Sequence, residues 1–216
     1  MAPFILSGQL RPFVDSGFEG KQLIMNDELI KNRLAFLERA EGLKNAVRSA
    51  HSSGGRPESA AEHSWRLALM AMIFADEFAG LDLTRILKLC LVHDLGEAIH
   101  GDIPANLQTP DDGRAEAERE DLLDLVSGLD SGPRREIIEL WEEYEGAASP
   151  EARLVKGLDK LETLIQHNQG LNPPDFDYSF NLGYGQDRMD GHPLLPRIRR
   201  LVDELTARHD AESRRP

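Results

Sequence analysis

Residues 87–102 read LKLCLVHDLGEAIHGD, the stretch from which both the fold and the chemistry of this chain can be inferred. We predict a helix over 84–99, because one helix face, at positions i, i+3, i+4 and i+7, holds Ile86, Leu89, Cys90 and His93. Asp94 follows at the end of this face, where a buried carboxylate is costly unless it is paired or bound to a cation. Glu97 and Asp102 come soon after. The pattern favours a cation site over the alternative, a solvated acidic helix end.

A second imidazole lies upstream, in a helix whose start is marked by a capping box. Ser59 and Glu62 have the spacing at which two side chains satisfy each other's backbone donors, which predicts a helix from there to about residue 78. His63 shares its helix face with Leu67 and Met70. A lone histidine on such a face is typically a core residue. His63 is therefore a candidate metal ligand only in combination with the other polar residues.

A further carboxylate lies at the border of an apolar helix stripe. Residues 153–165 read RLVKGLDKLETLI, and their apolar positions have helical spacing within a helix predicted over 150–168. Asp159 lies beside that stripe. It is either a ligand that faces inward or one half of a surface ion pair with Lys156 or Lys160.

The rest of the chain also has helical patterning, because apolar and polar residues rarely alternate. Further helices are predicted at 27–45, 114–127, 133–145 and 194–208. Stretches rich in turn residues are predicted to be loops at 52–58 and 101–113, and 170–193 is expected to be ordered by packing alone. Trp65 and Trp141 are expected to be core anchors. The predicted fold is all-α, a compact single-domain helical bundle over 26–208, with an N-terminal arm at 1–25 and a flexible tail at 209–216.

The composition of the chain disfavours nucleic acids and membranes as binding partners of the protein. The 216 residues carry a formal net charge of −13, which repels phosphate backbones and disfavours nucleic-acid polymers as partners. No apolar run approaches the ~18 residues of a membrane span, so we expect no membrane association. The single cysteine, Cys90, rules out an internal disulfide and suits the reducing cytoplasm, where we expect the protein to reside.

The candidate ligands together offer two imidazoles and two carboxylates, from His63, His93, Asp94 and Asp159. Two carboxylates neutralise the formal charge of a divalent ion. Mixed nitrogen and oxygen donors suit Mn²⁺, Co²⁺, Fe²⁺, Ni²⁺ or Zn²⁺ better than Mg²⁺. Four protein ligands in an octahedral shell leave positions open for water and a phosphate oxygen, as catalysis requires. We expect one divalent metal ion at this site.

Four segments of the chain resemble the HD-domain phosphohydrolases, and more narrowly the branch that hydrolyses deoxynucleoside 5′-monophosphates. They are RPESAAEHSWRLALMA (56–71), LVHDLGEAIHGDIP (91–104), ELWEEYE (139–145) and ARLVKGLDKLE (152–162). The resemblance implies an HD-type helical bundle and a small nucleotide substrate. It also implies a homodimer, which nothing in the periodicity indicates.

The resemblance also implies roles for individual residues. His63, His93, Asp94 and Asp159 match the metal ligands of the family. Glu97 matches the acidic residue that activates the attacking water, and Asp102 a second carboxylate near the phosphate or sugar. Arg48 matches an arginine that contacts the substrate phosphate. Ser49 stands where some relatives carry a tryptophan, which leaves base stacking and nucleoside preference open.

Two other functions compete with a deoxynucleoside 5′-monophosphatase. One is another HD-type activity, on a cyclic dinucleotide, a guanosine alarmone or a nucleoside triphosphate. The other is a metal-stabilised helical binding module without turnover. Glu97 and Asp102 disfavour this module, because a purely structural ion has no use for two additional carboxylates.

Overall fold

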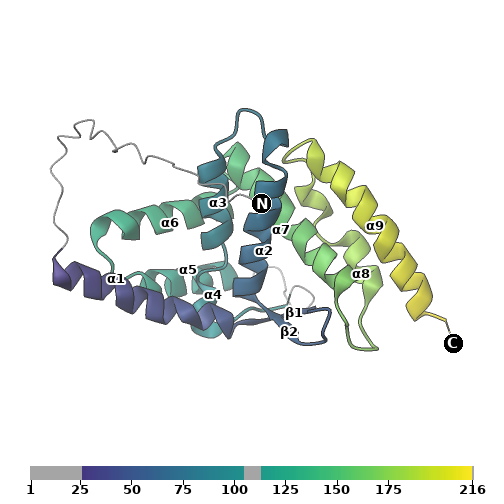
Figure 1. Ribbon diagram of the computed structural model, residues 1–216, viewed down its shortest axis with the longest axis horizontal. Helices are drawn as coiled ribbons and strands as arrows, with labels where there is room; N and C mark the ends of the chain where they lie inside the picture. Colours follow the sequence, from purple (N-terminus) through teal and green to yellow (C-terminus); the bar gives the residue numbers. More distant parts are fainter. Residues whose placement is uncertain (1–25, 105–112, 216) are drawn as a thin grey trace, which may run out of the picture.

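The computed structural model describes residues 26–104 and 113–215, so the arm predicted at 1–25 and most of the predicted 101–113 loop lie outside the described residues. The described chain is mostly helical (Figure 1), which confirms the predicted all-α class. The helices are α1 (Asp27–Ala40), α2 (Ala60–Ile73), α3 (Leu83–Val92), α4 (Glu97–His100), α5 (Arg114–Leu125), α6 (Ser131–Glu145), α7 (Pro150–Gln169), α8 (Tyr178–Gly183) and α9 (Leu194–Ser213). None of the described helices is both long and apolar enough to cross a membrane.

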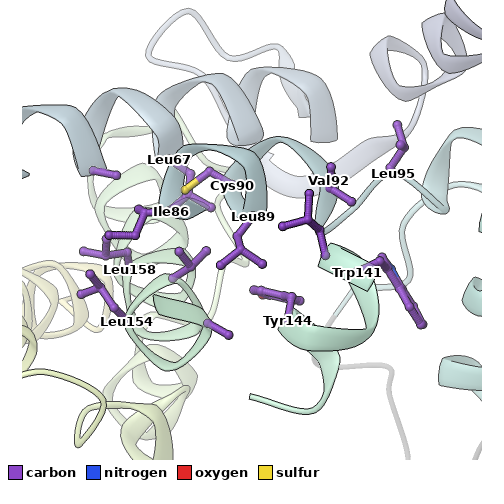
Figure 2. Close-up of a cluster of buried hydrophobic side chains, with 14 of the residues drawn as sticks. Leu67, Ile86, Leu89, Cys90, Val92, Leu95, Trp141, Tyr144, Leu154 and Leu158 are labelled. Carbon is purple, nitrogen blue, oxygen red and sulfur yellow. The ribbon is translucent and has the colours of Figure 1, made fainter. Parts of the chain in front are cut away.

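The core is built around α7, whose middle is buried on nearly all sides. Helices α2 and α3 pack against it and against each other, and α3 also contacts α6. Figure 2 shows the apolar side chains at this junction, with Leu89 of α3 between Leu158 of α7 and Tyr144 of α6. On its other side α7 is covered by α9, which runs beside it in Figure 1. Residues on α2, α3 and α7 are therefore brought close together although they are distant in sequence.

Several helix boundaries differ from the prediction for identifiable reasons. The helix expected over 84–99 ends at Val92, and a turn leads to the short α4. Gly96 lies in this turn, where a Cβ atom would approach the backbone oxygen of Glu118 to 2.6 Å. This close approach to α5 requires glycine. The helix expected over 27–45 ends at Ala40 and continues as a single 3-10 turn over Glu41–Lys44.

A small antiparallel hairpin was not predicted. Its strands are β1 (Val47–His51) and β2 (Pro57–Ser59), so the segment predicted as a loop at 52–58 includes most of the second strand. Strands this short have too few residues for an alternating pattern to be visible. The hairpin leads directly into α2 through Ser59.

The C-terminal third holds more regular structure than predicted. Helix α8 and a 3-10 turn at Gln186–Arg188 lie inside the 170–193 segment, and α9 runs to Ser213, beyond its predicted end at 208. Trp141 is buried in the core as expected. The prediction for Trp65 was wrong: its side chain is on the outer face of α2 and 63% of its surface is exposed.

Candidate metal centre

His63 lies in the first turn of α2 and is fully buried. The capping box predicted for this helix is present: Ser59 Oγ accepts from the Glu62 amide, and the Glu62 carboxylate accepts from the Ser59 amide. This fixes the first turn and hence the direction of the imidazole. His63 Nε2 lies 3.1 Å from Asp159 Oδ1 and 3.3 Å from His93 Nε2.

His93 and Asp94 occupy the turn where α3 ends. His93 Nε2 lies 3.1 Å from Asp94 Oδ2, and the same oxygen is 3.9 Å from His63 Nε2. A helix that continued through 99, as predicted, would not make this turn. The break after Val92 therefore contributes to placing the carboxylate beside both rings.

Asp159 projects from the middle of α7 and is buried. Its Oδ1 faces His63, while Oδ2 accepts hydrogen bonds from the Tyr144 hydroxyl at 2.8 Å and from Lys160 Nζ at 2.9 Å. Asp159 therefore faces inward, and its pair with Lys160 is not the surface ion pair of the alternative interpretation, because the carboxylate is buried. Burial raises the pKa of the Asp159 carboxyl, but Lys160 and His63 outweigh it and hold that pKa well below its ordinary value.

Three of the four candidate ligands, His63, His93 and Asp94, have the spacing of donors to a single cation, and Asp159 lies beside His63. Two atoms bound to one ion at about 2.1 Å lie about 3.0 Å apart at a right angle and about 4.2 Å apart when opposite. The four separations given above, from 3.1 to 3.9 Å, fall between these limits. The ligand atoms of His63, His93 and Asp94 all lie within 4.8 Å of one another.

The hydrogen bonds behind the rings also suit a metal. His93 Nδ1 donates to the carbonyl oxygen of Cys90 at 3.0 Å, and His63 Nδ1 donates to the carboxylate of Glu162. With both Nδ1 atoms protonated and engaged, the lone pair of each Nε2 points toward the centre. The residues present therefore fit a divalent metal ion.

Glu162 is the residue that sequence reasoning missed. It is almost fully buried on α7, three residues after Asp159, and its second oxygen accepts from Arg66 Nε on α2. Buried carboxylates are uncommon, but in the sequence Glu162 looks like one more charged residue in KLETL. Only the packing of α2 on α7 reveals that it orients His63.

We expect Glu162→Gln to weaken metal affinity about 10- to 100-fold, the usual effect of removing the partner of a ligating histidine. An amide has a single acceptor oxygen, so it cannot accept from both His63 Nδ1 and Arg66 Nε as the two carboxylate oxygens do. Isothermal titration of the metal-free protein with Mn²⁺ measures the change, and Glu139→Gln, at an exposed position on α6, is the matched control. Equal affinity in both variants would remove Glu162 from this role.

The two carboxylates with predicted catalytic roles lie beside the centre. Glu97 begins α4 and is buried, and its Oε2 has no hydrogen-bond partner among the described residues. Burial, followed by the nearby carboxylates of Asp94 and Asp102, raises the pKa of Glu97 to about 10. Burial also raises the pKa of Asp102. A bound cation would relieve the repulsion among these carboxylates, because its charge would dominate the local electric field.

Arg48 reaches the same place from β1. Its Nη1 donates to Asp94 Oδ2 at 3.2 Å and its Nη2 to Thr163 Oγ1 at 3.1 Å. Burial lowers the pKa of the guanidinium, but Asp94 and Asp102 outweigh it and raise that pKa above its ordinary value. Arg48 is therefore a permanent positive charge at the rim of the centre.

A cavity of about 680 Å³ opens from the centre. One end is lined by His93, Asp94, Glu97, Asp102 and Asp159, with Arg48 and Ser49 beside them. The other end is formed by α8 and the segments that flank it. Six of the seven predicted site residues thus line one cavity, and His63 lies behind its wall in contact with Asp159.

Comparison with known proteins places this arrangement in a family. Residues 40–199 match the HD domain family. The chain is 38% identical to 5′-deoxynucleotidase HDDC2 of Danio rerio over 64% of this chain and 69% of that protein. It is 35% identical to the Homo sapiens protein of the same name over 82% and 86% of the two chains.

A solved structure has the same fold. It is described as a predicted metal-dependent phosphohydrolase from Magnetospirillum magnetotacticum MS-1, and is 26% identical with a TM-score of 0.74 over 85% of this chain and 95% of that one. Residues 40–199, which match the family, contain the hairpin, the four candidate metal ligands and α8. The chain therefore belongs to the HD domain family.

Proposed function

We propose that this protein is a metal-dependent 5′-deoxynucleotidase, which hydrolyses the phosphomonoester of deoxynucleoside 5′-monophosphates. The observation that carries the proposal is the convergence of His63, His93, Asp94 and Asp159 at one end of a cavity that also presents the partly buried Arg48. Relatives that bear the deoxynucleotidase name match most of the chain. Their name supports the choice of substrate.

The four convergent residues would hold one divalent metal ion, for which Mn²⁺, Co²⁺, Fe²⁺, Ni²⁺ or Zn²⁺ suits the donors better than Mg²⁺. When bound, such an ion polarises a phosphoryl group and makes water more acidic. Glu162 keeps the His63 ring in the orientation that presents Nε2. Tyr144 and Lys160 hold the carboxylate of Asp159.

The remaining residues of the centre act on substrate and water. Arg48 binds the phosphate through its fork of N–H donors, a planar geometry that lysine cannot reproduce. The charge of a bound cation would lower the pKa of Glu97 and leave it ionised, and Glu97 would then take the proton from the attacking water as general base through the oxygen that has no other partner in the described chain. Asp102 orients the water or the sugar hydroxyl. The proton accepted by Glu97 can then pass to the leaving 5′-oxygen.

Phosphate release from a substrate panel tests the proposal. The panel contains the deoxy- and ribonucleoside monophosphates, a deoxynucleoside triphosphate, a cyclic dinucleotide and a guanosine alarmone, each with Mn²⁺, Co²⁺, Mg²⁺ or EDTA. We expect release from deoxynucleoside monophosphates that EDTA abolishes. Preference for another member of the panel would favour another HD-type activity, and no release with any metal would favour the binding module.

The proposal includes a homodimer, supported by an apolar stripe on the outer face of α2. Its members Trp65, Leu69, Met72 and Ile73 are exposed at helical spacing. Light scattering of the purified protein should give the mass of a dimer, and Trp65→Glu should give a monomer, because it places a charge in the apolar surface that the dimer would bury. Leu201→Glu on α9 is the matched control. A monomeric wild type would contradict this part of the proposal.

We also propose the cytoplasm as its compartment, which the single buried cysteine supports. Fractionation of cells followed by immunoblotting would test this assignment, and recovery of the protein in a secreted or organelle fraction would contradict it.

A further inference from the structure

The end of the cavity away from the metal centre is aromatic, although the sequence there is dominated by turn residues. Phe176, Phe180 and Tyr184 line it from α8 and its flanks. The rings of Phe180 and Tyr184 are one helical turn apart and stack with centroids 5.7 Å apart and planes 29° from parallel. Phe180 keeps 40% of its surface exposed. An aromatic surface that is still accessible inside a cavity is a platform for a flat ligand.

This aromatic surface is connected to the metal centre through Lys160. Lys160 Nζ, which donates to Asp159 Oδ2, also lies 5.3 Å from the centroid of the Tyr184 ring. A molecule that reaches from Asp159 to Tyr184 therefore stays within one continuous wall of the cavity. The platform belongs to the same binding site as the metal centre.

A pair of unsatisfied polar atoms lies beside the platform. His167 Nδ1 donates to Asn181 Oδ1 at 3.0 Å, and both side chains are more than nine-tenths buried in the cavity wall. Within the described chain, His167 Nε2 and Asn181 Nδ2 have no hydrogen-bond partner. Burial lowers the pKa of His167 to about 4, so Nε2 is an acceptor at neutral pH and Asn181 Nδ2 is a donor. A buried polar atom without a hydrogen-bond partner costs folding free energy, and a ligand that bonds to it removes that cost.

Helix α7 connects the metal centre with His167 along one of its faces. Asp159, Thr163 and His167 are at i, i+4 and i+8 on α7, and all three line the cavity. Eight residues rise about 12 Å along a helix axis, a span that a phosphate, a sugar and a base can bridge together. If the phosphate binds near Asp159, the base of the same nucleotide therefore lies near His167.

We propose that this lobe of the cavity binds the nucleobase of the substrate. The flat face of the base packs on Phe180 and Tyr184, and its edge exchanges hydrogen bonds with His167 Nε2 and Asn181 Nδ2. Any base edge that presents a donor next to an acceptor suits this pair. The inference rests on the proposed function and assigns to α8 the stacking role that Ser49 cannot perform.

The first test compares a nucleotide with a substrate that lacks the base. For dAMP, Phe180→Ala should raise KM about 10-fold with kcat little changed, because stacking of one base on an aromatic ring is lost. For 2-deoxyribose 5-phosphate both constants should be unchanged. Phe180→Tyr should restore the dAMP value, and Leu201→Ala, at an exposed position on α9, is the matched control. An equal loss on both substrates, or no loss on either, would overturn the inference.

The second test addresses the polar edge. Asn181→Asp keeps the acceptor for His167 Nδ1 and replaces the free N–H₂ group with an oxygen. The order of kcat/KM among the four deoxynucleoside monophosphates should change, and an unchanged order would contradict the assignment of Asn181.

Calorimetric titration with dAMP separates this inference from the proposed function. A wild type that turns over no monophosphate would refute the proposed function. If dAMP still binds about 10-fold more weakly to Phe180→Ala than to wild type, the base site stands alone. Equal binding to both proteins would refute the base site.

Discussion

Replacing Asp94 with alanine should abolish metal binding and reduce phosphate release by more than about 10³-fold, because a catalytic ion contributes several kcal/mol to the transition state. Asp94 supplies an oxygen 3.1 Å from His93 Nε2 and also one of the two carboxylates that would balance the charge of the ion. Its loss leaves Asp159 as the only carboxylate among the four candidate ligands. Metal analysis of the dialysed protein and a phosphate-release assay measure the two effects.

Asp94 also accepts from Arg48, so the variant needs a check on folding. Asp94→Asn preserves the shape of the side chain and should lose the metal as well, since an amide carries no charge. Asp76→Ala, at an exposed position after α2, is the matched control, and its metal content should equal that of wild type. A full equivalent of metal in both Asp94 variants, with circular dichroism like wild type, would refute the ligand assignment.

Replacing Glu97 with alanine should have the opposite combination of effects, with metal retained and turnover lost. A general base contributes about 10²- to 10⁴-fold to the rate, and kcat should fall by that amount. The four ligand atoms do not include Glu97. The two carboxylates that balance the charge of the ion, Asp94 and Asp159, are both kept, so affinity for a cation should be little changed. Metal analysis and steady-state kinetics on the same preparation separate the two properties.

Glu97→Gln is the closer test of proton transfer, because it keeps the size of the side chain and removes only its basicity. Glu116→Ala, on the exposed face of α5, controls for loss of an acidic residue nearby in sequence. If kcat of Glu97→Gln matches wild type, Asp102 becomes the remaining candidate for the base. If metal is lost in both variants, Glu97 acts as a ligand instead.

Local signals explain which parts of the fold were predictable. The starts of α2 and α7 were predicted because Ser59 and Ser149 are side-chain caps, which act within a single turn. The end of α3 was not predicted, because the helical spacing of its inner face continues to His93, and the break lies close to the point where α5 approaches Gly96. A tertiary contact of that kind leaves no periodic trace in the sequence.

Some residues of the site could likewise be predicted from the sequence, and others could not. The positions of His63, His93, Asp94 and Asp159 could be proposed because polar residues on apolar helix faces are conspicuous. The structure brings them together, while their roles stay predictions. Glu162 is hidden among the surface charges of α7. The aromatic lobe was missed because Phe180 and Tyr184 belong to a helix too short to give a periodic signal.

The helix that supplies Asp159 lies far along the chain from the two that supply the histidines, and this has a consequence for biosynthesis. The ribosome releases both histidines well before it releases Asp159 on α7. Domains generally fold as units, and a metal site of this kind rarely exists before its domain is folded. Capture of the ion is therefore a late event in the life of the nascent chain. Fragments from stalled translation that end before α7 lack the complete donor set and should not deplete the metal supply of the cell.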